Sequence, residues 1–229
     1  MRVEPPAELG TRDGLAYALF LPDGDVDGGV VIIHGADSCK ENHFDFARAL
    51  QAAGLAVVAF DQRGHGESEG ALGASVLDDV ATVAALLPPG PIALRGSSMG
   101  GFVALMAGAR LDAAAVVAIC PATGEMLARG LQDREFDFRV DQDGLEELLL
   151  DADERAAARA LGDRLLLLHA EGDERVPIAS SRELHAAAPG SRLVAAPGGD
   201  HRSVQHDPEL QALAARFIAQ ALRPPHAQA

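Results

Sequence analysis

A serine between two glycines is the strongest indication of chemistry in this sequence. Ser98 lies in the pattern G-x-S-x-G, with a short apolar run at 91–94 before it and a longer one at 101–107 after it. The run 101–107 has the composition of a buried helix. A strand that turns sharply through this pattern into a helix presents the serine hydroxyl at the edge of a sheet as a nucleophile. Gly96 and Gly100 are expected because a Cβ at either position would collide where strand and helix cross.

The same five-residue pattern occurs a second time, at 66–70. No strand is predicted before Ser68 and no apolar helix after it, and a glutamate stands on each side of the serine. A motif match requires its structural context. We therefore predict that 66–70 is a solvated loop without a catalytic role.

A serine hydroxyl needs a base within hydrogen-bond distance, and a third group must orient that base. Of the eight histidines, His201 follows the last predicted strand in a loop with glycines at 198 and 199. Those glycines allow the loop to reach back across the sheet edge, so His201 is the expected base. His206 is the alternative, but its position at the start of the final helix favours a side chain that faces solvent.

The orienting carboxylate is expected between the serine and the histidine along the chain. Asp173 lies just past the predicted strand 165–168. This is the carboxyl end of a strand, where open α/β sheets assemble their sites. Asp200 is the alternative acid, although adjacent residues rarely face one another. We predict Ser98, Asp173 and His201 as the catalytic triad.

Two backbone N–H groups are expected to bind the negative charge that develops during the reaction. The segment 34–36 follows the first predicted buried strand, and Gly35 lets the backbone turn there. The N–H groups of Ala36 and Met99 are the expected pair, assisted by the positive end of the helix after Ser98.

The elements that must position these residues form an alternating series. Strand patterns recur between helix patterns, which predicts a mostly parallel, doubly wound sheet with helices on both faces. The first strand is expected to pair in a hairpin with residues near the N-terminus. Predicted strands cover 16–20, 30–33, 57–60, 92–94, 115–119, 165–168 and 192–196, and predicted helices cover 44–53, 76–87, 101–107, 180–187 and 208–221.

One segment, 121–164, is longer than a single crossover needs. Within it, Phe136, Phe138 and Val140 alternate with charged residues, which is typical of a half-buried strand or hairpin. The stretch 145–161 is predicted as one or two amphipathic helices. We interpret 121–164 as a short lid and the three apolar side chains as substrate-binding residues. The alternative is that 121–164 is a surface segment that only packs against the sheet.

Composition limits the partners and the location. The chain has 229 residues, which suits one α/β domain, and 48% of them are hydrophobic. A net charge of −15 argues against a nucleic acid or an anionic membrane surface as a partner. No apolar run has the length of a membrane span, and the first six residues lack the apolar core of a signal peptide. We therefore predict a cytoplasmic protein.

Metal binding is not predicted. The two cysteines, Cys39 and Cys120, form no metal-binding pattern and no disulfide framework, and no paired histidine spacing occurs. Free thiols are expected.

Five motifs carry a resemblance to a known family. They lie at 34–35 with 40–42, 60–68, 96–101, 172–177 and 199–201. Taken together, they resemble the α/β-hydrolase superfamily, specifically its small esterases and serine aminopeptidase-like hydrolases, a branch that includes feruloyl esterases and monoacylglycerol lipase-like enzymes. The resemblance covers nearly the whole chain and implies a single domain over 1–229 and a serine hydrolase without a cofactor.

The predicted function is hydrolysis of small-molecule carboxylic esters through an acyl-enzyme, with short-acyl or aryl esters preferred. A thioesterase or a peptidase would use the same triad, and a non-hydrolytic member such as a perhydrolase or lyase is a further alternative. A binding protein on an inactive scaffold is the alternative of a different class, which the intact triad disfavours. The sequence leaves the oligomeric state open.

Overall fold

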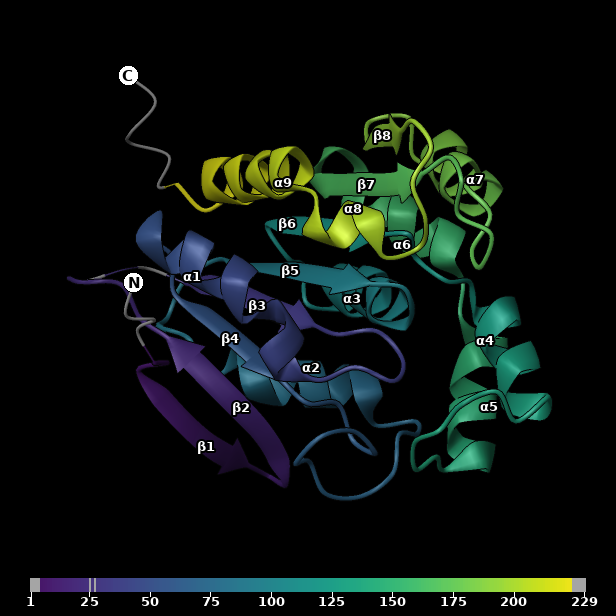
Figure 1. The fold of residues 1–229 in the computed structure, drawn as a ribbon, viewed down its shortest axis with the longest axis horizontal. Helices are drawn as coiled ribbons and strands as arrows, with labels where there is room; N and C mark the ends of the chain where they lie inside the picture. Colours follow the sequence, from purple (N-terminus) through teal and green to yellow (C-terminus); the bar gives the residue numbers. More distant parts are fainter. Residues whose placement is uncertain (1–4, 25, 27, 224–229) are drawn as a thin grey trace.

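The computed structural model of the protein describes residues 5–24, 26 and 28–223. In these residues eight strands form one sheet in the order β1-β2-β4-β3-β5-β6-β7-β8 (Figure 1). The first two strands and the β2–β4 pair are antiparallel, and all other neighbours are parallel. The strands are β1 (Glu8–Arg12), β2 (Leu15–Phe20), β3 (Gly29–Ile33), β4 (Val57–Phe60), β5 (Ile92–Ser97), β6 (Ala115–Ile119), β7 (Leu165–Ala170) and β8 (Arg192–Ala196).

Helices cover both faces of this sheet. The α-helices are α1 (Phe44–Ala52), α2 (Val76–Ala84), α3 (Met99–Arg110), α4 (Gly124–Gln132), α5 (Gln142–Asp151), α6 (Glu154–Leu161), α7 (Ala179–Ala187), α8 (Ser203–His206) and α9 (Pro208–Ala221), and short 3-10 turns cover Lys40–His43 and Gly162–Arg164. One apolar cluster joins the sheet to α2, α3 and α6, and a second joins its other face to α1 and α9. The predicted doubly wound α/β sheet is therefore confirmed.

The continuous β-branched and leucine runs explain the central strands. Every residue of β3, β4, β6 and β7 is buried, as expected of parallel strands covered on both faces. The predicted hairpin between β1 and β2 is also present. No helix in the described part of the chain is long and apolar enough to cross a membrane.

The segment 121–164 differs from its prediction in two respects. It contains a helix that was not expected, α4, whose N-cap Thr123 accepts a hydrogen bond from the N–H of Met126. The predicted strand or hairpin at 136–140 is wrong: this stretch is irregular, and only Val140 forms a bridge, to Leu72. Without a longer partner the extended backbone cannot continue a ladder.

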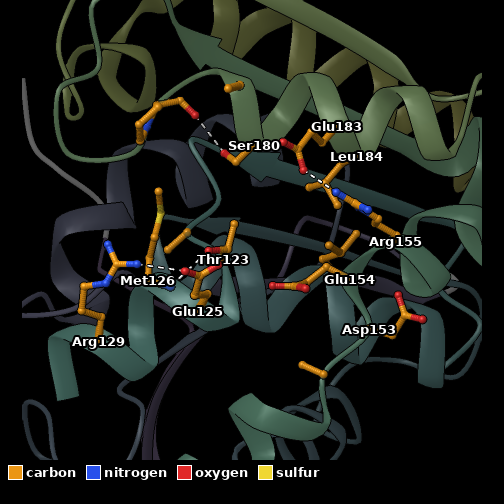
Figure 2. A pocket seen from close by; sticks show the side chains of 15 residues that line it. Thr123, Glu125, Met126, Arg129, Asp153, Glu154, Arg155, Ser180, Glu183 and Leu184 are labelled. Carbon is orange, nitrogen blue, oxygen red and sulfur yellow. Dashed lines mark hydrogen bonds and ion pairs between the residues drawn. The ribbon is translucent and has the colours of Figure 1, made fainter. Parts of the chain in front are cut away.

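The last helix of the segment belongs to the main fold. Helix α6 packs against α3 and α7, whereas α4 and α5 pack against each other at the edge where β3 and β5 end (Figure 1). A pocket of about 490 Å³ lies where α4, α6 and α7 meet. Figure 2 shows that charged side chains line it, with ion pairs between Arg129 and Glu125 and between Arg155 and Glu183.

Candidate active site

Ser98 lies in a strained turn between β5 and α3. Its φ is 55° and its ψ is −122°, a conformation that non-glycine residues rarely adopt. The backbone N–H of Ser98 donates to the carbonyl of Ile119 at 2.9 Å, which ties the turn to the adjacent strand. A Cβ added at Gly96 would lie 1.9 Å from the carbonyl oxygen of Gly100, and one at Gly100 would lie 2.3 Å from that of His34. The expected steric requirement for both glycines is therefore present.

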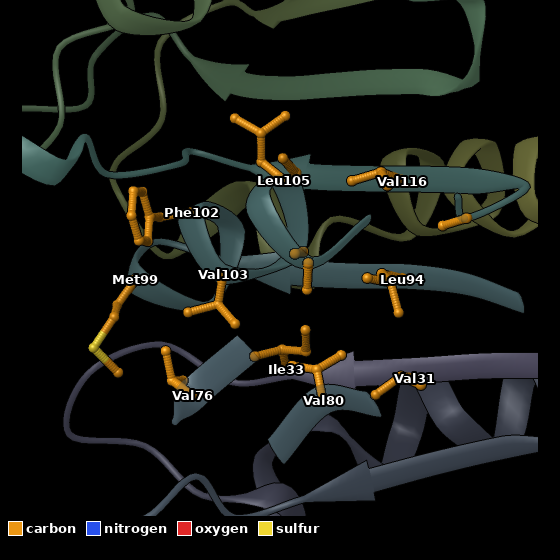
Figure 3. Packing of buried hydrophobic residues seen from close by; sticks show 14 of the residues in the cluster. Val31, Ile33, Val76, Val80, Leu94, Met99, Phe102, Val103, Leu105 and Val116 are labelled. Carbon is orange, nitrogen blue, oxygen red and sulfur yellow. The ribbon is translucent and has the colours of Figure 1, made fainter. Parts of the chain in front are cut away.

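Packing of α3 holds the turn in place. Figure 3 shows Met99, Phe102 and Val103 of this helix beside apolar side chains of α2 and β3, among them Val76 and Ile33. All five side chains are at most 3% exposed. Because the helix begins directly after Ser98, this core fixes the direction in which the serine is presented.

His201 and Asp173 form a direct hydrogen bond. His201 Nδ1 donates to Asp173 Oδ2 at 2.7 Å, and the two residues come from the loops that follow β8 and β7. The loop conformation depends on glycines 198 and 199, both at positive φ. The alternative acid, Asp200, is exposed, and its Oδ1 accepts the N–H groups of Arg202 and Ser203 within its own loop.

The carboxylate of Asp173 is held from its other side by the backbone. Asp173 Oδ1 accepts the N–H groups of Arg175 and Val176, each at 2.9 Å. Burial acts to raise the pKa of Asp173, but the Val176 N–H and His201 outweigh it, so this pKa lies below its ordinary value. Asp173 is therefore an anion at neutral pH, as a group that orients a histidine must be.

A second histidine, which is fully buried, lies behind the acid, and sequence reasoning missed it. His169 Nε2 donates to the carbonyl of Val176 at 2.8 Å, and its Nδ1 accepts from Ser181 Oγ at 2.7 Å. The same Nε2 lies 3.6 Å from Asp173 Oδ2. Burial lowers the pKa of His169, which keeps it neutral. His169 thus holds the turn that supplies the Val176 N–H to the carboxylate.

The ligand atoms of Cys120, His169 and Asp173 lie within 4.8 Å of one another. Both ring nitrogens of His169 and both oxygens of Asp173 already take part in the hydrogen bonds described above. The arrangement therefore suits support of the acid better than metal ligation.

The segment after β3 lies against the serine. A Cβ added at Gly35 would lie 3.3 Å from Ser98 Cβ and 3.1 Å from the carbonyl oxygen of Ser97, so the backbone passes close to the turn. Ala36 follows directly, and Met99 is the first residue of α3, whose N–H has no partner within the helix. His34 is buried beneath this segment, where Nδ1 donates to the carbonyl of Gly35 and Nε2 accepts the N–H of Gln62.

Ser98 and His201 line one cleft of about 420 Å³, together with Ala36. In the described residues no hydrogen bond joins Ser98 Oγ to His201, and such contacts often tighten only when substrate binds. The alternative base, His206, also lines this cleft but has no carboxylate partner among the hydrogen bonds and ion pairs of the described chain.

The three side chains that were predicted to bind substrate do not all lie in the cleft. Phe136 lines the cleft, whereas Phe138 and Val140 are not among its lining residues. The ring of Phe138 lies 5.1 Å from that of Phe136 and 4.0 Å from that of His65, measured between centroids. Helix α4 supplies further apolar lining at Met126 and Leu127, which the sequence did not indicate because this helix was not predicted.

The second G-x-S-x-G segment is a loop, as predicted, and its residues 66, 67, 69 and 70 are exposed, but the serine itself is not solvated. Ser68 is 2% exposed. Its Oγ donates to the carbonyl of Asp61 at 2.6 Å and accepts the N–H of Ala16 at 2.8 Å. The glutamates beside it are exposed, and Glu67 accepts a hydrogen bond from Lys40 Nζ. The flanking charges misled the prediction because they lie outside while the serine lies inside.

Comparisons with known proteins agree with this architecture. A family model described as serine aminopeptidase, S33, matches residues 24–136, and a model described as TAP-like protein matches residues 151–228. The structure of Est1E from Butyrivibrio proteoclasticus with ferulic acid bound superposes with a TM-score of 0.76 at 19% identity, covering 94% of this chain and 99% of that one. The chain belongs to the α/β-hydrolase superfamily.

Two further proteins are similar to this α/β-hydrolase, one in sequence and one in structure. A monoacylglycerol lipase of Mycolicibacterium smegmatis is 33% identical over 105 residues, which are 42% of this chain and 38% of the lipase, so the match spans well under half of that relative. The structure of XC6422 from Xanthomonas campestris, described as a serine hydrolase without a lid, has a TM-score of 0.66 at 21% identity over 97% of this chain and 98% of that one.

Proposed function

We propose that this α/β-hydrolase is a serine carboxylic-ester hydrolase that works through an acyl-enzyme. Ser98 Oγ attacks the ester carbonyl while His201 accepts its proton, and Asp173 holds and stabilises the imidazolium. The N–H groups of Ala36 and Met99 bind the oxyanion. The alcohol leaves with the proton from His201, and water activated by the same histidine then releases the acid.

One observation carries this proposal. The hydrogen bond between His201 Nδ1 and Asp173 Oδ2 leaves Nε2 as the base, in the same cleft as a serine held at a strained turn. Backbone strain at a turn with a nucleophilic side chain is a recurrent property of active sites. No cofactor is needed for these steps.

The cleft also supports a proposal about the acyl group. Met126, Leu127 and Phe136 supply its apolar lining, and they come from α4 and the segment that follows it. We propose that this part acts as a lid shorter than 121–164, within one domain over 1–229. So small an apolar surface favours short-acyl or aryl esters over long-chain substrates, because each fully buried apolar side chain contributes only about 1.5–3 kcal/mol. The cytoplasmic location stays a prediction.

The test combines labelling with a substrate panel. A fluorophosphonate probe should label the wild type at Ser98 and should not label the Ser98→Ala variant. The panel consists of p-nitrophenyl esters of rising chain length, aryl esters, acyl-CoA thioesters and aminoacyl amides. If a thioester or an amide were turned over faster than every ester, the protein would be a thioesterase or an amidase and not an ester hydrolase. If the probe failed to label the wild type, the scaffold would be inactive.

A further inference from the structure

Two arginine side chains line the proposed catalytic cleft without a partner of opposite charge. Arg175 lies two residues after Asp173, and Arg202 follows His201 directly. Both are exposed, and in the described part of the chain neither guanidinium makes an ion pair or a hydrogen bond. Of the other arginines in the described residues, Arg95, Arg134, Arg139, Arg192, Arg216 and Arg223 also lack a carboxylate partner, whereas nine have one: Arg12, Arg48, Arg63, Arg110, Arg129, Arg155, Arg159, Arg164 and Arg182.

The excess of acidic residues makes two unpaired arginines in one cleft informative. The chain has 34 acidic residues against 19 lysines and arginines, so a basic side chain readily finds a partner on its surface. Together with Asp37 and Glu135, which also line the cleft, the two guanidinium groups balance its formal charge in an otherwise acidic protein. An arginine fork matches the geometry of a carboxylate or a phosphate, to which it can donate two parallel hydrogen bonds.

The position of the two arginines indicates which part of an ester they would meet. In the proposed mechanism His201 gives its proton to the departing alcohol oxygen, so the alcohol must lie beside the His201 loop. Arg202 belongs to that loop, and Arg175 to the neighbouring loop after β7. The apolar lining at Leu127 and Phe136 comes instead from α4 and the segment after it.

We propose that the preferred substrates are esters whose alcohol part carries an anionic group, a carboxylate or a phosphate, bound by Arg175 and Arg202. This inference rests on the proposed ester hydrolysis and adds the substrate class. The guanidinium groups take no part in bond making: the bond between the acyl carbon and the alcohol oxygen breaks, the alcohol takes the proton of His201, and water supplies the hydroxyl of the acid.

Two carboxylates also line this cleft, and they would favour a substrate of the opposite charge. Asp37 follows the proposed oxyanion segment, and its Oδ1 accepts the N–H of Asp137 at 3.3 Å. Glu135 lies beside Phe136. If these carboxylates controlled recognition, an alcohol part with a positive charge would be preferred, so a cationic ester belongs in the test.

The experiment uses four acetate esters that share one acyl group. Their alcohols are 3-hydroxypropanoate, its neutral amide 3-hydroxypropanamide, 2-hydroxyethyl phosphate and choline, so that each substrate has a single carboxylic ester bond. The quantity compared is the ratio of kcat/KM for each charged ester to kcat/KM for the neutral one, in the wild type and in Arg175→Gln, Arg202→Gln and the double variant. Intrinsic reactivity cancels when ratios are compared between variants. Arg216→Gln removes one charge from α9, outside the cleft, and serves as the matched control.

We expect each cleft substitution to lower the ratio for an anionic ester about threefold to tenfold, as for a partly exposed charge-assisted hydrogen bond. The double variant should lower it further, high salt should reduce the wild-type preference, and Arg216→Gln should leave the ratio unchanged. A response with only one of the two anionic esters identifies the carboxylate or the phosphate as the recognised group.

Ratios that are unchanged in the double variant, or a wild-type preference for the choline ester, would overturn this inference while ester hydrolysis itself stands. If the wild type hydrolysed none of the four esters, the proposed function would fail, and the inference with it.

Discussion

Ser98 and Ser68 occupy the same place in the same five-residue pattern, yet the chain uses them in opposite ways. Ser98 is partly exposed in a cleft, at a positive φ, with its Oγ free of hydrogen bonds within the described residues. Ser68 is buried, and its Oγ both donates and accepts. The pattern therefore specifies close backbone packing around a serine, while the neighbouring elements decide whether its hydroxyl is accessible in a cleft or is used in buried hydrogen bonds.

The two regions are connected through His34. Its main chain lies against Gly100 in the turn of Ser98, and its Nε2 accepts the N–H of Gln62 in the loop that leads to Ser68. The loop 61–68 therefore supports the segment that carries Gly35 and Ala36. We therefore expect substitution of Ser98 to affect the reaction and substitution of Ser68 to affect stability.

The largest effect is expected for Ser98→Ala. Turnover should fall on the order of 10⁴-fold or more, because a catalytic triad acts as a unit, and the thermal midpoint of unfolding should stay close to that of the wild type. Steady-state kinetics and thermal unfolding measure the two quantities. Ser68→Ala is the matched control, and an inactive but stable Ser68→Ala enzyme would reverse the assignment.

Asp173→Asn should reduce kcat/KM by about 10²–10⁴-fold, since the imidazole of His201 loses the anion that orients it. Asp200→Asn is the comparison, because Asp200 only closes hydrogen bonds within its own loop. Activity should change there by no more than a few fold. Equal losses in the two variants would mean that loop conformation, and not the carboxylate of Asp173, controls the reaction.

Much of the site could be predicted from sequence because its parts lie at strand ends. The β-branched and leucine runs locate β3, β6 and β7, and residues just past them must meet at one edge of a parallel sheet. The order serine, acid, histidine then singled out Asp173 and His201, which the structure brings into contact.

Other features depend on contacts between distant segments, which no local pattern encodes. The burial of Ser68 results from partners at Ala16 and Asp61. The alternation at 136–140 predicted a strand, but within the described residues its one β-bridge joins Val140 to Leu72. The support of Asp173 by His169 likewise depends on how the loop after β7 folds back.

Acid should destabilise the junction between the two regions. Burial lowers the pKa of His34 to about 4, and its Nε2 must stay unprotonated to accept the Gln62 N–H. A histidine whose folded pKa is depressed takes up its proton more readily when unfolded, so stability is lost as pH falls below the unfolded value of about 6.5. His34 alone should cost about 3 kcal/mol of unfolding free energy between pH 7 and pH 4.

Urea unfolding at a series of pH values measures this loss. Burial likewise lowers the pKa of His43, His65 and His169, so the total slope should exceed that of one histidine. His34→Gln should flatten the slope. A slope that is the same in this variant and in the wild type would contradict the assignment to His34.

Ser68→Ala should lower stability by about 1–3 kcal/mol, because the buried N–H of Ala16 is left without an acceptor. Activity per folded molecule should stay near the wild-type value. Two variants serve as controls. Ser68→Thr retains a hydroxyl but adds a methyl group, and Ser97→Ala alters the residue beside the nucleophile. Loss of activity without loss of stability in Ser68→Ala would show that the loop acts on the chemistry directly.

The smallest effect separates two aromatic neighbours, one beside each serine region. Phe136 lines the proposed cleft, whereas Phe138 lies against His65 of the loop 61–68. Phe136→Ala should raise KM for aryl esters about fivefold, since a half-buried ring loses roughly 1 kcal/mol of contact with substrate. Phe138→Ala should instead lower the unfolding free energy by about 0.5–1.5 kcal/mol through the lost ring contact, with KM unchanged. A rise in KM in Phe138→Ala equal to that in Phe136→Ala would mean that the two rings act as one surface, and that the loop of Ser68 contributes to substrate binding after all.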